Sequence, residues 1–240
     1  MHVNRVKAFV KALSPGVYSA FSRSCWSMAQ YIRDRSHRSL FDEIYRAHAW
    51  YDPDSVSGPG SNLARTALIR KAIPELLVQC HIESILDIPC GDCYWASRMA
   101  IGSCRYIGAD IVQELVARNS RNYGRRGLEF QTLDITRDRL PKVDMVLCRD
   151  CLPHFSFSAS MSTLSNIKQS RAAYVLTTTF TDRPENTDII TGDWRPLNLQ
   201  ASPFNFPAPI VLINEGCQEA SGAFSDKSLG LWRIADIPLD

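Results

Sequence analysis

Acidic residues recur in the middle of the chain, each directly after a short apolar run. Asp87, Asp110 and Asp134 follow three such runs in order, and Asp150 follows a fourth. A carboxylate at the end of a strand can take both hydroxyls of a ribose. It can also cap the helix that follows, by accepting N–H groups of the first turn. Both roles stay open for any one acid, but the ordered series favours a binding site.

The first apolar run leads into a turn that carries one glycine, Gly91. A nicotinamide dinucleotide requires Gly-x-Gly-x-x-Gly, with its pyrophosphate at a helix N-terminus. Here Asp87 and Asp92 lie on either side of the glycine instead. Carboxylates repel a pyrophosphate and attract a cationic amine. The turn therefore favours S-adenosylmethionine, which has a cationic amine and no phosphate, over NAD.

The fourth apolar run ends in a polar group of three residues, Arg149, Asp150 and His154. His154 is the candidate general base, because an unperturbed imidazole pKa of about 6.5 suits proton abstraction near neutrality. A histidine that only packs under the next helix is the alternative. Asp150 could orient the imidazole, bind an acceptor or cap that helix. Arg149 could hold an anionic group of an acceptor.

The apolar runs alternate with helical patterns, which predicts a parallel sheet covered on both faces. In such a sheet ligands bind beyond the carboxyl ends of the strands, where the acids described above would gather. The expected strands are 84–88, 105–110, 128–135, 143–149 and 172–180, and the expected helices are 94–100, 111–121 and 158–169.

The C-terminal quarter of the chain changes character. Residues 182–209 are rich in Pro and Asn and predict irregular structure, whereas 210–214 and 229–237 predict an antiparallel hairpin. We expect 181–209 to be a substrate lid, although a structural cover is equally consistent with this composition. The candidate acceptor-binding residues near this segment, besides Arg149, are Thr178, Trp194, Arg195 and Asn198.

The N-terminal 40 residues differ from the rest in charge. They carry seven Lys or Arg and one acid, a net of +6; since the chain carries +2, the remaining residues sum to −4. Apolar residues at helical spacing between Val3 and Leu13 predict a basic helical extension, 1–40. It could cap the main domain, or contact a protein or an anionic membrane surface. The small net charge of the whole chain gives no reason to expect nucleic acid.

Between this extension and the first strand, 41–50 predicts a helix and 51–61 a turn-rich loop. A second helix should begin near Asn62 and end near Gln79, with a kink or break at Pro74. No run is long enough to span a bilayer, and no secretory signal is evident. We therefore expect a cytoplasmic protein, with an organellar or peripherally membrane-bound one as the alternative.

Eight cysteines include two Cys-x-x-Cys pairs, Cys90/Cys93 and Cys148/Cys151. Paired cysteines of this kind can hold structural zinc, and both pairs would follow strands that are commonly neighbours. Each pair also lies in a segment already interpreted as part of the ligand site, after the first or the fourth apolar run. We therefore expect free thiols and no metal.

Four motifs together resemble a little-characterised, mainly bacterial group of class I methyltransferases. They are Ser-x-Ser-Gly-x-Gly-Ser at 55–61, Asp-x-Pro-Cys-Gly-Asp at 87–92, Tyr-Ile-Gly-Ala-Asp-Ile at 106–111 and Cys-Arg-Asp-Cys-Leu-x-His at 148–154. Trp194–Leu199 also matches, whereas Pro89 and Cys93 replace the outer glycines of the usual first motif. The resemblance covers residues 41–237. It implies a Rossmann-like α/β fold with a mostly parallel seven-stranded sheet, in a methyltransferase domain spanning 41–240.

The resemblance also implies roles for residues. Asp87 and Gly91 would flank the methionine part of S-adenosylmethionine, Asp110 would hold the ribose, and Asp134 would accept from the adenine amino group. The loop at 57–61 would fold over the cofactor. The remaining residues expected at the cofactor are Tyr51, Ser57, Gly58, Ser61, Pro89, Cys90, Ile111, Ile135 and Arg149.

The expected function is methyl transfer from S-adenosylmethionine to oxygen or nitrogen of a small-molecule or glycan-like acceptor, with S-adenosylhomocysteine as product. A binding module that keeps the fold without catalysis is one alternative. A NAD-dependent oxidoreductase is another, disfavoured by the acidic turn with its single glycine.

Overall fold

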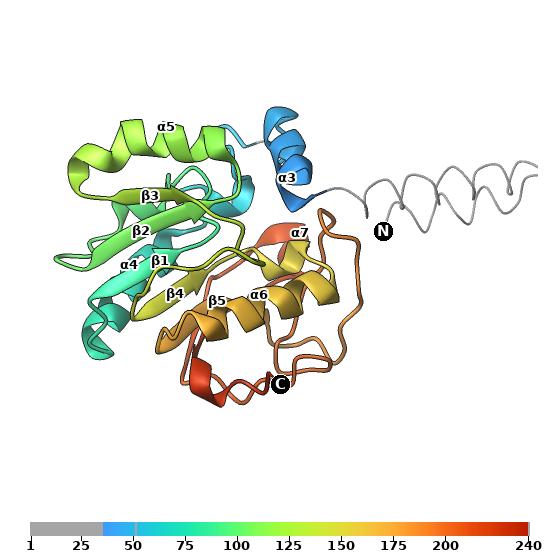
Figure 1. The fold of residues 1–240 in the computed structure, drawn as a ribbon. Helices are drawn as coiled ribbons and strands as arrows, with labels where there is room; N and C mark the ends of the chain where they lie inside the picture. Colours follow the sequence, from blue (N-terminus) through green and yellow to red (C-terminus); the bar gives the residue numbers. More distant parts are fainter. Residues whose placement is uncertain (1–35, 51, 240) are drawn as a thin grey trace, which may run out of the picture. The chain divides into compact units, whose positions relative to one another are not determined.

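The computed structural model describes residues 36–50 and 52–239 (Figure 1). The basic helix expected within 1–40 and the predicted cofactor residue Tyr51 therefore lie outside the described residues. The chain divides into two compact units, Met1–Ser36 and His37–Asp240.

Seven strands form one sheet in the order β3-β2-β1-β4-β5-β7-β6. The first five run parallel, whereas β7 is antiparallel to both β5 and β6. This is the mostly parallel, Rossmann-like α/β fold with a C-terminal antiparallel pair that the sequence predicts. The strands are β1 (Ser84–Asp87), β2 (Arg105–Asp110), β3 (Glu129–Thr132), β4 (Met145–Cys148), β5 (Tyr174–Phe180), β6 (Val211–Asn214) and β7 (Lys227–Arg233).

The central strands are buried on both faces, as expected for a sheet covered by helices on each side. Neighbouring residues of a strand point to opposite faces, so Ile85 and Leu86 enter two different hydrophobic clusters. The cluster around Ile85 includes Ile69 and Ile73 of α4 (Ala67–Gln79), and the cluster around Leu86 includes Leu164 of α6 (Phe157–Gln169). The two clusters fix the sheet between α4 and α6 (Figure 1).

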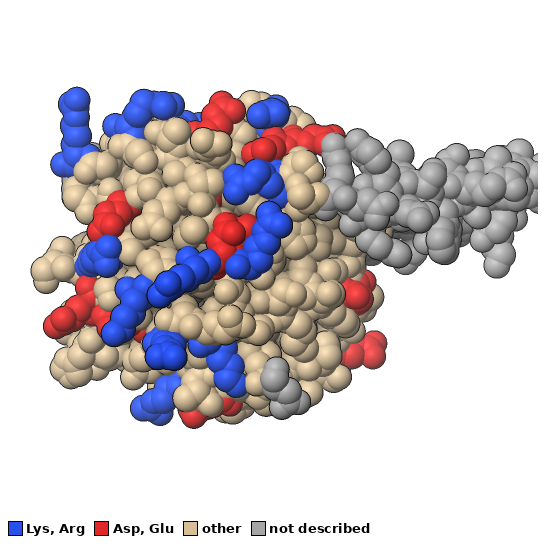
Figure 2. All heavy atoms as spheres, viewed as in Figure 1, with Lys and Arg blue, Asp and Glu red and all other residues tan. Residues whose placement is uncertain are grey.

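The remaining longer helices are α3 (His37–Arg46) and α5 (Gln113–Tyr123), and a four-residue helix, α7, spans Glu219–Gly222. α5 packs along β2 and β3 (Figure 1). Pro74 lies inside α4 without ending it. No helix in the described part of the chain is long and apolar enough to cross a membrane. Basic and acidic side chains are interspersed over the face of the domain seen in Figure 2.

The helix expected at 94–100 is wrong. The segment between β1 and β2 contains only a three-residue 3-10 turn, Ala96–Arg98. Gly91 and Cys93 both have positive φ, and Met99 returns to an extended conformation, so the turns leave no room for an α-helix. Trp95 and Met99 nevertheless stay buried, because the turns pack against the α4 side of the sheet.

The segment 181–209 is irregular, as predicted, and most of its large side chains are buried. Leu197, Leu199, Phe204 and Phe206 all belong to the cluster around Leu86. Within the segment, Trp194 is the exposed large apolar residue. The apolar side chains of 197–206 therefore pack as a cover on the sheet, whereas the Trp194 ring is partly exposed.

Candidate functional site

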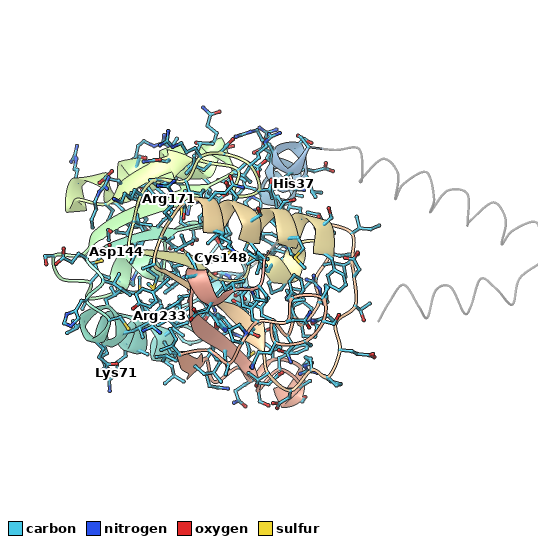
Figure 3. All side chains as sticks on the ribbon, turned by 60° about the horizontal axis from the view of Figure 1, so that its bottom comes forward. His37, Lys71, Asp144, Cys148, Arg171 and Arg233 are labelled. Atoms are coloured by element: carbon cyan, nitrogen blue, oxygen red, sulfur yellow. The ribbon has the colours of Figure 1, made fainter. Side chains whose placement is uncertain are left out.

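A cavity of about 620 Å³ opens beyond the carboxyl ends of β1, β2 and β4. The strand order reverses between β1 and β4, which is where open α/β sheets bind ligands. Figure 3 labels Asp144, which directly precedes β4, and Cys148, the last residue of β4, with His37 on the Cys148 side. The size lies within the range of small-molecule and cofactor sites.

One wall of the cavity begins with Asp87, the last residue of β1. Its carboxylate is buried and accepts a hydrogen bond from the Tyr106 hydroxyl at 2.5 Å. Burial raises the pKa of Asp87 to about 7, although the Tyr106 hydrogen bond and the Arg149 charge oppose the rise. A carboxylate held in this way gains from a cation placed beside it. Pro89 and Gly91 continue the same wall.

Asp110, at the end of β2, is the next acid along this wall. Its two oxygens accept the N–H groups of Gly91 and Val112, at 3.1 and 3.0 Å. Burial raises the pKa of Asp110 to about 6, and those backbone N–H groups limit the rise. Each carboxylate oxygen has a second lone pair, so the side chain can still accept two hydroxyl groups from the cavity.

Asp134 lines the cavity but also holds its own turn together. Its Oδ1 accepts from the Thr136 N–H and hydroxyl, and its Oδ2 pairs with Arg137 at 3.0 Å. The described residues that directly follow Asp134 form no helix, so these contacts stabilise a turn and do not cap a helix. Asp110 and Asp134 each use part of their hydrogen-bond-accepting capacity on nearby groups of the protein. The N–H of Ile135 has no acceptor among the described residues.

The loop 55–61 is fastened to the β1 turn by Asp92. The Asp92 carboxylate accepts from the Ser55 hydroxyl at 2.9 Å and from the Val56 N–H at 3.0 Å. In return, the Asp92 N–H donates to the Ser57 hydroxyl at 3.0 Å. Asp92 is buried and lies outside the cavity lining, and its carboxylate is used to hold the loop. The acidic charge beside Gly91 comes from Asp87 and Asp110.

His154 reaches the cavity from the turn after β4. Its Nδ1 lies 3.0 Å from the carbonyl oxygen of Asp193. Because a carbonyl only accepts, Nδ1 carries the proton and Nε2 keeps its lone pair in the neutral ring. Burial lowers the pKa of His154, while the Asp150 charge opposes the change. The imidazole is therefore neutral near pH 7 and arranged as a proton acceptor.

Arg149, Asp150, Glu215 and Lys227 form an ion network under the cavity. Arg149 makes two hydrogen bonds to Glu215, at 3.1 and 2.6 Å, and lies 3.3 Å from Asp150. Lys227 binds Asp150 at 2.7 Å and lies 3.5 Å from Glu215. Burial acts against ionisation, but the two cations together hold the pKa of Asp150 below its usual range. Glu215 and Lys227 were not expected, since both come from the C-terminal hairpin.

Most of the predicted site residues line this one cavity. Together at its walls are Ser57, Gly58, Ser61, Asp87, Pro89, Gly91, Asp110, Ile111, Asp134, Ile135, Arg149, Asp150, His154 and Trp194.

Four predicted residues are not brought to the cavity lining. The thiol of Cys90 faces Asn119 of α5. Thr178 accepts the backbone N–H of Asp150 at 2.8 Å and so positions that residue. Arg195 donates to three carbonyl oxygens, of Leu152, Phe155 and Thr187, and Asn198 donates to the Arg183 carbonyl. These contacts stabilise the turn after β4 and the irregular segment.

Aromatic residues that the sequence did not single out complete the cavity. Phe41 and Tyr45 come from α3, whereas Phe180 ends β5 and Phe224 precedes β7. The helical pattern at 41–50 and the apolar end of the fifth strand were visible in the sequence. Their approach to one cavity depends on tertiary packing, which periodicity does not reveal.

The two Cys-x-x-Cys pairs lie apart in the structure. Cys93 belongs to the cluster around Ile85, whereas Cys148 and Cys151 belong to the cluster around Leu86. Among the described residues, no group of three or more His, Cys, Asp or Glu side chains is placed to hold a metal.

Residues 85–171, a little over a third of the chain, match a family model described as a methyltransferase domain. The match spans β1 through the end of α6, so it contains Asp87, Asp110, Asp134 and His154. No curated protein matches the chain.

Solved structures of methyltransferases resemble the fold at low identity. Human N-acetylserotonin methyltransferase in complex with S-adenosylmethionine is 16% identical, with a TM-score of 0.49 over 90% of this chain and 69% of that one. Magnesium protoporphyrin IX methyltransferase from Synechocystis, with the same ligand, is 14% identical, with a TM-score of 0.48 over 62% and 78%. The methyltransferase domain of bacterial CtHen1 is 14% identical, with a TM-score of 0.43 over 49% of this chain and 66% of that one. Similarities at this level carry no argument about activity.

Proposed function

We propose that the protein is an S-adenosylmethionine-dependent methyltransferase that acts on oxygen or nitrogen of a small-molecule acceptor. One observation carries the proposal. The carboxylates of Asp87, Asp110 and Asp134 line one wall of a single cavity at the switch point of the sheet. The residues that form this wall fall within the segment that matches a methyltransferase domain.

The residues present fit S-adenosylmethionine in their chemistry. Asp87 would accept the ammonium group, Asp110 the ribose hydroxyls, and Asp134 with the Ile135 N–H the adenine edge. Ile111 and Leu133 supply apolar surface for the adenine ring. When bound, the cofactor supplies an electrophilic methyl group on a sulfonium.

The same wall disfavours a dinucleotide. A pyrophosphate is normally held by the N-terminus of a helix directly after the first strand. Among the described residues, only the short turn Ala96–Arg98 lies between β1 and β2, and it begins after Asp92 and Cys93. The two buried acids beside Gly91 would in addition repel phosphate oxygens.

The chain's own residues can supply alignment and a base. The loop 55–61 is held in place by Asp92, and it lines the cavity beside Gly91. His154 offers Nε2 to a proton of the acceptor, with Nδ1 fixed by the Asp193 carbonyl. Proton removal of this kind typically contributes about 10²- to 10⁴-fold to rate.

Calorimetric titration with S-adenosylmethionine and S-adenosylhomocysteine tests the donor assignment. Asp110→Asn should weaken both ligands by on the order of tenfold or more, since it removes a charged hydrogen-bond acceptor. Asp236→Asn changes an exposed acid that does not line the cavity, so it should leave both affinities unchanged. No binding at millimolar ligand by folded protein would refute the proposal. Binding without turnover on any acceptor would instead indicate a non-catalytic binding module.

A further inference from the structure

The acceptor side of the cavity carries two groups of aromatic rings. Phe180, Trp194 and Phe224 contact one another edge to face, with ring centroids 6.0, 6.0 and 4.9 Å apart. In the second group, the Trp50 ring lies 4.8 Å from His154 and 6.2 Å from Phe41. All of these side chains line the cavity.

His154 connects the two groups. Its ring contacts Trp50, and its Nδ1 is bound by the carbonyl of Asp193, the residue next to Trp194. Nε2 of His154 is therefore a hydrogen-bond acceptor on a ring that is linked to both aromatic groups. A ligand held between those groups would meet this atom as its nearest unpaired acceptor.

The charged groups on the acceptor side are already paired. Arg149 and Lys227 are matched by Asp150 and Glu215 in the ion network. Glu219, the remaining charged residue of this side, pairs with Arg65. Neither an anionic nor a cationic acceptor would therefore find a free counter-charge among the described residues. This arrangement favours an uncharged acceptor.

The polar side chains that suit a sugar are directed elsewhere. Thr178, Arg195 and Asn198 are buried and bonded to the backbone, outside the cavity lining. A buried hydroxyl without a partner costs free energy, so a polyol would lose several hydrogen bonds on entering. A compound with one hydroxyl needs only the one acceptor that His154 offers.

On the basis of the proposed function, we propose that the acceptor is an uncharged planar aromatic compound with a phenolic hydroxyl. Its ring lies between Trp50 and the cluster of Phe180, Trp194 and Phe224, and its hydroxyl faces Nε2 of His154. The hydroxyl proton passes to Nε2 as the oxygen lone pair forms the bond to the methyl carbon. The carbon–sulfur bond of the sulfonium breaks, and its electron pair stays on sulfur as a neutral thioether.

The acidity of the hydroxyl supports a phenol over an aliphatic alcohol. The phenolic side chain of tyrosine has a pKa of about 10, within reach of an imidazole base. An aliphatic hydroxyl is a much weaker acid, and a histidine with a lowered pKa would deprotonate it poorly.

The test uses the full chain with S-adenosylmethionine and 2-naphthol, beside 2-naphthoate and methyl glucoside as charged and polyol probes. We expect 2-naphthol to yield its methyl ether, identified by mass, at a kcat/KM at least tenfold above that of either other probe. Binding of 2-naphthol to protein saturated with S-adenosylhomocysteine is measured separately by calorimetry.

The aromatic cluster is tested with Trp194, which is 42% exposed. Trp194→Ala should raise the dissociation constant of 2-naphthol on the order of tenfold, whereas Trp194→Phe should keep it within about threefold. Leu212→Ala, an exposed apolar change on β6 outside the cavity, is the matched control. The affinity for S-adenosylmethionine should not change in any of them.

Protein that binds S-adenosylmethionine but prefers methyl glucoside or 2-naphthoate would overturn the phenol assignment alone. The same holds if 2-naphthol neither binds nor reacts, or if Trp194→Ala leaves its binding unchanged. Loss of S-adenosylmethionine binding itself would refute the proposed function, so the two failures are distinguishable.

Discussion

The hydroxyl of Ser57 occupies the space into which a β-carbon on Gly91 would project. Gly91 also has φ +55°, a conformation that side chains disfavour. The Asp92 N–H donates to the same hydroxyl, so loop and turn fit against each other only while residue 91 is glycine. The glycine of the β1 turn is thus required by the loop over the cavity, independently of any ligand.

Gly91→Ala should therefore displace the loop 55–61 and weaken S-adenosylmethionine binding by tenfold or more, measured by calorimetry. Gly102→Ala is the matched control, because Gly102 has φ +59° but nothing within 4 Å of the added carbon. Both variants carry the conformational cost of about 1–2 kcal/mol, and only the first carries the collision. Equal ligand affinity in the two variants would contradict the role of Ser57.

The raised pKa of Asp87 makes stability depend on pH. The pKa is about 7 in the folded protein against an ordinary value of 3.8, so the folded state holds a proton that the unfolded state releases. This contribution is fully present below about pH 4 and is lost as the pH rises through about 7. The loss amounts to on the order of 4 kcal/mol.

Urea denaturation of wild type and Asp87→Asn between pH 4 and 8 checks this expectation. The asparagine variant does not titrate, so its stability relative to wild type should improve as the pH rises across that window. Asp236→Asn should follow the wild-type profile. Parallel profiles for wild type and Asp87→Asn would show that Asp87 is ionised in both states.

The buried ion network should depend strongly on Glu215. Glu215→Gln removes the carboxylate that accepts two hydrogen bonds from Arg149 and lies near Lys227. An unpaired buried charge costs about 3–5 kcal/mol, whereas an exposed pair contributes about 0–1 kcal/mol. The control is Glu129→Gln, which breaks the exposed pair with Arg105. Chemical denaturation should show a large loss for the first and almost none for the second, and similar losses would contradict the network.

The acids predicted for the cofactor meet at one wall of the cavity, whereas Thr178, Arg195 and Asn198, predicted for the acceptor, do not line it, and the difference has a physical reason. Asp87 and Asp110 each end a strand, and parallel strands bring their carboxyl ends to one edge whatever the side-chain details. The residue type of Arg195 does not show whether its side chain faces the cavity or the protein interior. In the structure its guanidinium is buried and donates to backbone carbonyls, and the sequence cannot distinguish this from a guanidinium that faces a ligand. Glu215 reaches Arg149, and Lys227 reaches Asp150, only through the antiparallel hairpin, whose register is set by packing. The helix expected at 94–100 failed because positive φ at Cys93 is not visible in composition.

His154, as the base, should control the rate of methyl transfer and its dependence on pH. His154→Gln keeps a polar side chain but removes the titrating nitrogen, so kcat should fall by about 10²- to 10⁴-fold with the affinity for S-adenosylmethionine unchanged. Because burial lowers the pKa of His154, wild-type kcat should fall on the acid side only at a pH below the ordinary imidazole pKa of about 6.5, as Nε2 is protonated. Protonation of Asp87 and Asp110 should weaken binding of S-adenosylmethionine. Measuring kcat at saturating S-adenosylmethionine therefore separates that effect from protonation of His154. His81→Asn, at an exposed position with positive φ that asparagine tolerates, should behave as wild type. A kcat within threefold of wild type for His154→Gln, with the acid limb intact, would assign the proton transfer to another group.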